Sequence, residues 1–550
     1  MRRDLETALR VALCAGAAGA LLVGWAAFWF QCDDAYIAFR YVSASQLGWG
    51  YTWNPPPFQP VEGYTSFLWV VLLDGVWRLL GVEPPEAANW LALFFSAASL
   101  ALVVAMALRL RLSPGLTRLR TTLLGLVLLG VVGNRTFLAW TSSGLETALF
   151  GFLLLAWVSI AVFSAGSRSS LAWLSLSAGL LALARPDGLL FAGATAAILA
   201  VHVAAAGGIS ARTLAPALPL LIPVVHVLWR RIHYGFWLPN TYYAKLVAAW
   251  PEAGVRYFAA FVLEYAYWIW LALALVAAVR LLRGGGIAAR LRAGGPALAT
   301  RLLVGAALAL HFAYYTLRVG GDHFEFRVYQ HWVPLLLVSF ATVAEKAGLS
   351  PRRSLAALAA MVVLGWPLPW LHWWHTRNLT TREATFKLHY PVSPSLPAAV
   401  RWYGAAWDGL EGWLIRHLVG LRHQEHKIFG EHQLARFPAR AVGAQISGVG
   451  HPVLAYHTIG VPGWVLPNVA IIDWFGLNDM VIAHAKPKRA TSEERQMAHD
   501  RGPPEGYLEC FRPNVFVRKK KGISMRPRTR ELTADEIRAC EQRFLRGASS

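Results

Sequence analysis

Two adjacent aspartates, Asp33 and Asp34, follow the first apolar stretch of the chain and have side chains suited to catalysis. One carboxylate of such a pair can take the proton of an attacking hydroxyl group as a general base. Repulsion between close like charges raises the pKa of one member, which makes it a better base near neutral pH. The spacing alone leaves a second interpretation open, in which the pair only ends a helix in solvent.

Further groups of polar residues lie at the ends of later apolar stretches and are candidate binding residues. They are Glu62, Tyr64, Glu146, Arg185, Asp187, Asn240, Tyr243, Lys245, Asp322, His323, Glu325 and Arg327. Three of them, Arg185, Lys245 and Arg327, are cations of the kind that holds a phosphate leaving group. Structural roles remain open, because Arg185 can pair with Asp187 and Glu146 can be a simple charge at a helix N-terminus.

A metal site is not predicted from these residues. Asp322, His323 and Glu325 lie close together in the sequence, but their spacing fits no specific pattern of metal ligands. The sequence names no cofactor and leaves a requirement for a divalent cation open.

The chain that must position these residues is strongly apolar. Of its 550 residues, 56% are hydrophobic and only 15% are charged, and the mean hydropathy is +0.41. These values exclude an ordinary soluble protein and indicate a membrane protein. The net charge of +21 would suggest nucleic acid in a soluble protein, but membrane proteins concentrate Lys and Arg in short cytoplasmic loops. We therefore expect a lipid bilayer as partner and no nucleic acid.

The basic loops predict a topology of about eleven spans. The stretch 65–82 contains Asp74 and Arg78, which are costly inside a bilayer, so we expect a helix lying at the outer interface there. This choice places the basic loop 109–120 inside, the N-terminus in the cytoplasm and the aspartate pair outside. The expected spans are 11–30, 87–108, 121–138, 144–164, 171–186, 189–207, 213–232, 258–281, 302–319, 331–347 and 354–371.

From residue 372 the composition changes, and no stretch is apolar enough to span a bilayer. We expect a transmembrane domain over 1–371, with its first external loop at 31–86, and an extracytoplasmic soluble α/β domain over 372–550. The runs 452–459 and 469–475 predict strands, and 531–545 predicts an amphipathic helix. Two cysteines of this region, Cys510 and Cys540, can pair if it is extracytoplasmic.

Several motifs occur in an order that is more specific than any one of them. They are Asp33-Asp34-Ala35-Tyr36-Ile37, Glu62-Gly63-Tyr64-Thr65, Ser143-Gly144-Leu145-Glu146, Arg185-Pro186-Asp187-Gly188, Asn240-Thr241-Tyr242-Tyr243-Ala244-Lys245, Gly320-Gly321-Asp322 and Gly476-Leu477-Asn478-Asp479. In this combination the chain resembles the terminal β-(1→2)-arabinofuranosyltransferases of the mycobacterial cell wall, which belong to the GT-C class of glycosyltransferases that use polyprenyl-phosphate sugars.

The resemblance implies a GT-C fold in a plasma membrane, with the catalytic aspartate in the first external loop. It implies an inverting transfer of arabinofuranose from a polyprenyl phosphate to an envelope glycan, lipid or protein. By this analogy Asp33 is the base, Asp34 orients it or the acceptor, and the matching positions Glu62, Asp322, His323 and Arg327 line the cavity. A departure at Ala498-His499-Asp500-Arg501, where relatives tend toward Gly-His-Glu-Arg, weakens any role for His499.

Other classes of function are compatible with a polytopic chain. A transporter is expected to show inverted repeats or polar residues in mid-span, whereas the polar groups here gather at outer ends. An envelope scaffold would tolerate loss of the acids, which this chain retains. Transfer of a group other than a sugar from a lipid phosphate remains open.

Overall fold

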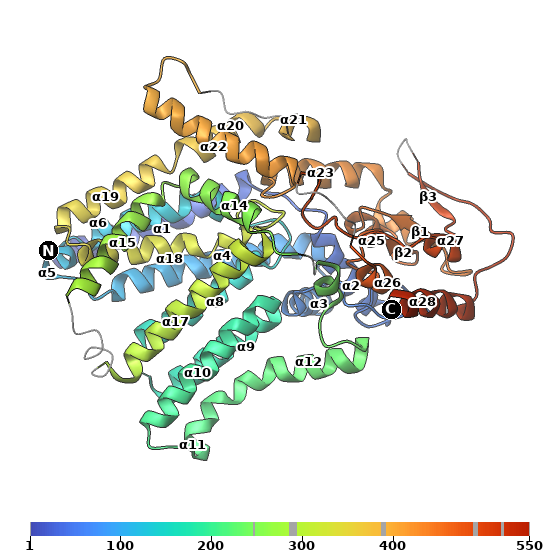
Figure 1. Ribbon diagram of the computed structural model, residues 1–550, viewed down its shortest axis with the longest axis horizontal. Helices are drawn as coiled ribbons and strands as arrows, with labels where there is room; N and C mark the ends of the chain where they lie inside the picture. The colour runs from blue at the N-terminus through green and yellow to red at the C-terminus, as the bar shows by residue number, and fades with distance from the viewer. Residues whose placement is uncertain are drawn as a thin grey trace.

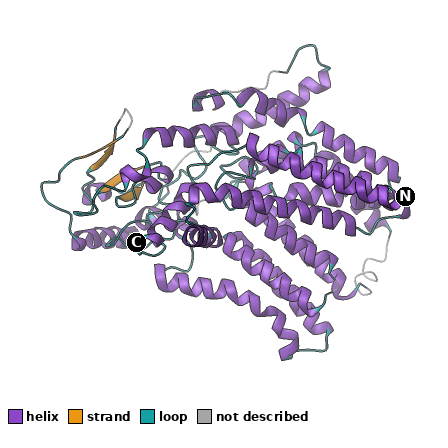
Figure 2. Ribbon diagram, turned by 180° about the vertical axis from the view of Figure 1, so that it is seen from behind, coloured by secondary structure: helices purple, strands orange, loops and turns teal. Residues whose placement is uncertain are grey.

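The computed structural model describes residues 2–164, 166–245, 248–284, 294–386, 392–487, 493–518 and 522–548. Helices make up most of it, and the few short strands lie at one end (Figure 2). A bundle of long helices forms the other end, where the N-terminus lies (Figure 1).

Six helical segments are long and apolar enough to cross a membrane, and this confirms a multi-pass membrane protein. They lie in α1 (Arg2–Ala27), α4 (Pro84–Arg109), α10 (Leu189–Ala205), α12 (Leu221–Tyr234), α17 (Gly295–Ala313) and α19 (Pro351–Leu364), some with short adjoining helices. A seventh span requires α14 (Pro251–Glu264) and α15 (Trp268–Arg283) to count together.

The predicted count of about eleven is higher than these six or seven. Helices do occur at the other predicted spans, namely α6 (Arg120–Val132), α8 (Thr147–Phe163), α9 (Arg168–Ala184) and α18 (Trp332–Lys346). They contain 13 to 17 residues, whereas a helix that spans a bilayer by itself needs about 20.

The predicted span 258–281 is not one continuous helix. The chain breaks after Glu264, and α14 and α15 meet at an angle of 101°. Ala266 at the break has a φ of 53°, a left-handed conformation that ends a regular helix.

The first external loop contains α2 (Ala35–Gln46) and α3 (Phe67–Leu80). The predicted interfacial helix corresponds to α3, which is not among the candidate spans of the described chain. Its buried Asp74 accepts hydrogen bonds from Ser45 (3.0 Å) and Tyr51 (2.9 Å) and pairs with Arg78 (3.1 Å). Partners within the loop therefore satisfy the charge that argued against a span.

The C-terminal region contains helices and two small sheets. The strands β1 (Val453–Tyr456) and β2 (Ala470–Asp473) pair in parallel, and β3 (Val515–Val517) pairs antiparallel with β4 (Ile523–Met525). Both predicted strands are confirmed, and so is the amphipathic helix, which is α28 (Ala534–Ala548). The other helices here are α20 (Pro367–Thr376), α21 (Arg382–Phe386), α22 (Ala398–Arg416), α23 (His423–Arg436), α24 (Arg440–Gly443), α25 (Gly460–Val465), α26 (Met480–His484) and α27 (Tyr507–Cys510).

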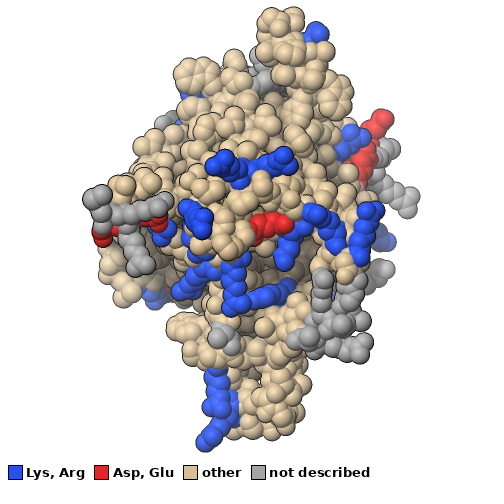
Figure 3. All heavy atoms as spheres, turned by 90° about the vertical axis from the view of Figure 1, so that its left-hand side faces the viewer, with Lys and Arg blue, Asp and Glu red and all other residues tan. Residues whose placement is uncertain are grey.

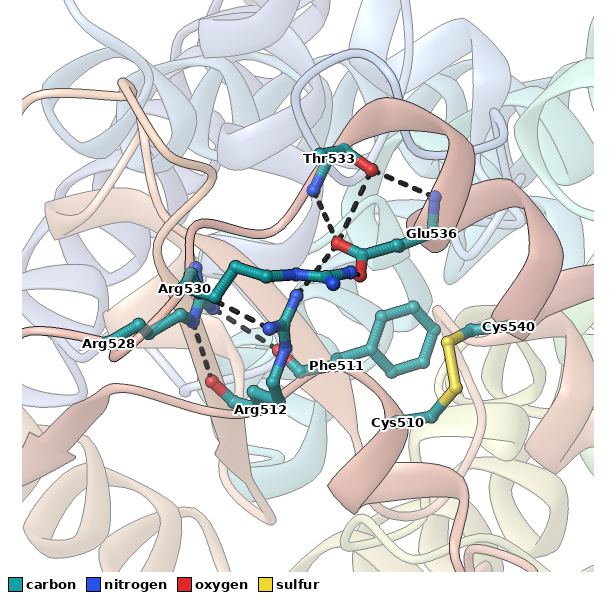
Figure 4. Close-up of a disulfide and its surroundings, with 8 residues drawn as sticks. All are labelled: Cys510, Phe511, Arg512, Arg528, Arg530, Thr533, Glu536 and Cys540. Atoms are coloured by element: carbon teal, nitrogen blue, oxygen red, sulfur yellow. Dashed lines mark hydrogen bonds and ion pairs between the residues drawn. A yellow bond between two sulfur atoms is a disulfide. The ribbon is translucent and has the colours of Figure 1, made fainter.

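A disulfide links Cys510 at the end of α27 to Cys540 in α28 (Figure 4). Beside it, Glu536 accepts hydrogen bonds from Arg512 (2.8 Å) and from the backbone N–H of Thr533 (2.9 Å). These contacts hold the start of α28 against the loop that follows α27.

The main hydrophobic core does not stop at residue 371. Phe39 and Trp53 of the first loop and Val461, Trp464 and Ile471 of the C-terminal region belong to the same buried cluster as the bundle helices. The first loop and the C-terminal region therefore share one packed interior.

Basic side chains predominate on the surface of the bundle end. Lys and Arg far outnumber Asp and Glu on the bundle end, where α5 (Pro114–Arg118) lies (Figures 1 and 3). The C-terminal region lies at the opposite end (Figure 1).

Candidate functional site

The backbone that carries the aspartate pair is held from two sides. Cys32 donates its backbone N–H to Ser143 O (3.1 Å), and Ser143 donates its own to Phe30 O (3.0 Å). On the other side α23 packs so closely that a Cβ on Gly430 would lie 2.6 Å from Gln31 O. The loop between α1 and α2 therefore has a fixed backbone path.

The two aspartates have different environments. Asp33 is 7% exposed, and its carboxylate accepts the backbone N–H groups of Gly460 (3.0 Å) and Val461 (2.9 Å). Burial raises the pKa of Asp33 to about 7, although the two hydrogen bonds oppose the shift. Asp34 is exposed at the start of α2, and within the described chain its side chain has no hydrogen bond or ion pair.

Lys245 is the cation associated with Asp34. It ends the short helix α13 (Asn240–Lys245), is exposed, and forms no ion pair with any residue that the structure describes. Desolvation by the surrounding protein lowers the pKa of Lys245, and the charge of Asp34 is the strongest effect opposing this shift. The acid and the ammonium group are therefore close enough to interact.

Arg327 and Asp322 form a second charged element of the site. Arg327 Nε donates to Asp322 Oδ2 (2.7 Å) and its Nη2 to Oδ1 (3.3 Å), and the two side chains keep 13% and 14% of their surface exposed. Burial acts to raise the pKa of Asp322, but Arg327, together with Arg185 and Lys245, outweighs it and the pKa falls below the usual value. Arg327 also acts on the pKa of Lys245, so both cations lie in the same electrostatic environment.

A small cavity lies next to this pair and has Arg185, Asp187, His311, His331 and Arg327 in its lining. Arg185 contacts Asp187 (3.1 Å) and Glu146 (3.3 Å). His311 Nε2 lies 2.8 Å from the other oxygen of Asp187. Arg185 and Asp187 therefore form the predicted ion pair. Both also line the same cavity as Arg327.

Two histidines complete the surroundings of Asp34. The rings of His323 and His499 have centroids 6.1 Å apart. Desolvation lowers the pKa of each ring, and the charge of Asp34 opposes the shift in both. The departure of the motif around His499 argued against a role for it, but its ring lies near that of His323 and packs against Phe475, with centroids 4.5 Å apart in the second contact.

Four other predicted binding residues make contacts that hold separate segments of the chain together. The buried Glu62 pairs with Arg230 through both oxygens (2.5 and 3.2 Å), and burial raises the pKa of Glu62 to about 7. Asn240 donates to Gly476 O (2.7 Å) and Leu477 O (3.0 Å). The hydroxyl of Tyr64 lies 3.1 Å from the hydroxyl of Tyr234. The ring of Tyr243 packs against the ring of His484, with their centroids 4.5 Å apart.

Glu325, another predicted binding residue, is completely buried. It contacts Arg135 (3.0 Å) and Arg422 (3.1 Å), and Arg422 also contacts Glu264 (2.6 Å) and Glu411 (2.8 Å). These five side chains are 0–6% exposed. The network supports the loop that carries Asp322 and Arg327, and a substrate cannot reach it.

Sequence reasoning did not identify four members of this network, because they come from four separated parts of the chain and form no motif. In the described part of the chain, no three His, Cys, Asp or Glu side chains are grouped so that they could hold a metal ion. Of the three residues considered for a metal, Asp322 and Glu325 are engaged by arginines.

The fold and the site define a mostly helical, multi-pass membrane protein with charged groups gathered at one end of its bundle. No protein-family model and no curated protein matches the sequence. The chain is similar to ArnT from Cupriavidus metallidurans bound to undecaprenyl phosphate, with 12% identity over 84% of this chain and 85% of that one and a TM-score of 0.47. It is also similar to the apo oligosaccharyltransferase of Archaeoglobus fulgidus, with 11% identity over 84% of this chain and 64% of that one and a TM-score of 0.41. These are similarities of overall arrangement, and no residue's role is taken from them.

Proposed function

We propose that this chain is a membrane glycosyltransferase that moves a sugar from a polyprenyl phosphate to an acceptor at the outer membrane face. The observation that carries the proposal is an exposed acid, Asp34, whose charge acts on an exposed cation, Lys245, while neither side chain forms an ion pair with a described residue. An acceptor hydroxyl group and a phosphate are the ligands that such a pair accommodates.

In the proposed reaction, the Asp34 carboxylate takes the proton of the acceptor hydroxyl group. The acceptor oxygen attacks the anomeric carbon from the side opposite the phosphate, and the bond between that carbon and the phosphate oxygen breaks. The electron pair leaves with the polyprenyl phosphate, whose charge Lys245 and Arg327 stabilise. A single displacement of this kind inverts the anomeric configuration.

Asp34 is a better candidate for the base than Asp33, which the family resemblance favoured. Both oxygens of Asp33 already accept backbone N–H groups, and the side chain is almost completely buried. A base must lie within hydrogen-bonding reach of the proton that it removes. The pKa of about 7 that burial gives Asp33 does not replace that access.

The proposed orientation has the basic bundle end in the cytoplasm and the C-terminal region outside. The excess of Lys and Arg over Asp and Glu on the bundle end is what the positive-inside rule expects of a cytoplasmic face (Figure 3). The disulfide between Cys510 and Cys540 also supports it, since disulfides persist in oxidising compartments. Exposed aromatic residues at the helix ends nearest Asp34 are of the kind found at membrane interfaces, namely Trp29, Trp90, Trp237, Tyr314 and Trp374.

The motif order favours arabinofuranose as the sugar and an extracytoplasmic envelope glycan as the acceptor. The test is a donor screen with purified protein, in which polyprenyl-phosphate arabinose, mannose and glucose are each supplied with an envelope extract. The proposal predicts release of polyprenyl phosphate and labelling of the extract with one of the sugars. Asp535→Asn, which changes a remote surface acid of α28, is expected to behave like the unmodified protein.

Two results would overturn the proposal. One is that no donor is cleaved in the screen. The other is that the lipid-linked sugar crosses the bilayer of a proteoliposome with its sugar–phosphate bond intact, which would identify a transporter.

A further inference from the structure

The short helix α25 of the C-terminal region lies against α2, the helix that begins directly after the aspartate pair. The rings of Phe39 in α2 and Trp464 in α25 have centroids 6.1 Å apart. Both belong to the main hydrophobic core. The helix that follows Asp34 is therefore packed against a segment more than 400 residues away in sequence.

Asp33 holds the beginning of α25. Its two carboxylate oxygens accept the N–H groups of Gly460 and Val461, and a negative charge at this end of a helix is favourable. A Cβ on Gly460 would lie only 1.8 Å from the backbone oxygen of Asp33 and 2.8 Å from its Cγ. The contact therefore requires glycine at position 460.

Arg40 holds the other end of α25. Its guanidinium group donates to Gly463 O (2.9 Å), Leu466 O (3.2 Å) and Val469 O (2.8 Å). The side chain is 2% exposed, and no carboxylate forms an ion pair with it in the part of the chain that the structure describes. Its charge is balanced by backbone carbonyl groups, of which those of Gly463 and Leu466 lie at the end of α25, where a cation is favourable. The carbonyl groups of Val469 and of Trp53 in the first loop also accept from it.

The spacing of the two residues matches the length of the helix that they hold. Arg40 in α2 lies seven positions after Asp33, which directly precedes the N-cap of that helix, and seven positions correspond to about 10 Å at the rise of a helix. The six residues of α25 span about 9 Å at the same rise. Because the two charges have the signs that suit the two ends of α25, the match favours one register and one direction of packing.

We propose that Asp33 and Arg40 clamp α25 by its two ends, and that this clamp fixes the position of the Asp34 carboxylate. Asp33 is then a positioning residue, and the C-terminal region helps to hold the catalytic acid in place. The role assigned to Asp34 rests on the proposed function, whereas the clamp itself does not.

The clamp is tested first without any activity, by hydrogen–deuterium exchange in the purified full-length protein. Asp33→Asn and Arg40→Gln are each expected to speed exchange of peptide 460–466 at least tenfold, because each frees hydrogen bonds of α25. Arg40→Lys keeps the charge and is expected to restore part of the protection. Gly409→Ala, at a glycine with no atom within 4 Å of the added Cβ, is the control and is expected to change nothing. Exchange that stays the same in both clamp variants would overturn the proposal.

The second test asks whether the clamp acts through Asp34. In sugar transfer, Asp33→Asn is expected to lower kcat at least tenfold in the unmodified background. In an Asp34→Asn background it is expected to lower the residual rate less than twofold, because there is no longer a base to position. A general loss of folded protein would lower both rates equally, and that result would refute the positioning role.

The two tests also separate this inference from the proposed function. Faster exchange in the clamp variants of a protein that transfers no sugar would retain the clamp and reject the glycosyltransferase. Sugar transfer by a protein whose clamp variants show unchanged exchange would retain the glycosyltransferase and reject the clamp.

Discussion

In the buried network around Arg422, removal of one acid and removal of one arginine are expected to have opposite effects on the stability of the protein. The network contains three carboxylates, Glu264, Glu325 and Glu411, and two guanidinium groups, Arg135 and Arg422. One negative charge is therefore in excess. Desolvation raises the pKa of Glu411 to about 7, with Arg422 opposing the shift, so the excess charge is relieved by protonation of Glu411.

The sign of the pH dependence follows from this raised pKa. The unfolded chain releases the Glu411 proton near its ordinary pKa of 4.5, whereas the folded protein holds it until about pH 7. The stabilisation is therefore complete below pH 4.5 and is lost as the pH rises through 7. A difference of between two and three pKa units corresponds to about 3 kcal/mol at this buried site.

Glu411→Gln removes the carboxyl group that titrates and keeps a neutral side chain of nearly the same size. At pH 5 the variant is expected to be as stable as the unmodified protein, because a neutral glutamine replaces a neutral acid. At pH 8 it is expected to be more stable by up to about 3 kcal/mol, because it has no buried charge to ionise.

Arg135→Met has the opposite effect, since it leaves a second carboxylate without a cation. Breaking a buried ion pair costs about 3–5 kcal/mol, and Arg135 and Glu325 are both completely buried. Thermal unfolding in detergent, followed by tryptophan fluorescence at pH 5 and pH 8, measures both variants. If Glu411→Gln were as damaging as Arg135→Met at pH 8, the assignment of the surplus charge to Glu411 would be refuted.

Three further predictions concern the site and its supports. Lys245→Met is expected to raise the donor KM by about tenfold to a hundredfold, the value of a hydrogen bond to a charged group; an unchanged KM in initial-rate assays would remove this lysine from the phosphate site. Gly63→Ala would place a Cβ 1.8 Å from an asparagine oxygen and is expected to destabilise the protein by about 1–3 kcal/mol in thermal unfolding. Gly75→Ala, where the added Cβ has no neighbour within 4 Å, is its control, and equal effects would contradict the packing described. Reduction of the Cys510–Cys540 disulfide, which closes a separation of 30 residues, is expected to cost about 4 kcal/mol of local stability; unchanged hydrogen exchange over 507–545 after reduction would show that the bond does not hold this segment.

The sequence predicted those features that depend on local patterns. Apolar runs located the long helices, and the charges of Asp74 and Arg78 predicted that α3, which is not among the candidate spans of the described chain, does not span. Short apolar runs bounded by Gly and Pro located β1 and β2. Each of these elements depends on residues that are neighbours in the sequence.

The features that the sequence did not predict depend on packing between distant segments. The helix break at Ala266 contains no proline or glycine from which it could have been predicted. The difference between Asp33 and Asp34 arises because Gly460 lies against one of them and not the other. The burial of Glu325 depends on Arg135 and Arg422, which lie on opposite sides of it in the sequence.

The central claim is that Asp34 is the base of a sugar transfer at the outer membrane face. Its most direct test is single-turnover transfer by purified Asp34→Asn with the donor that the screen identifies, compared with the unmodified protein at equal amounts of monodisperse material. The rate is expected to be about 10²–10⁴-fold lower, with donor binding retained because Lys245 and Arg327 are unchanged. Transfer at close to the unmodified rate would contradict it.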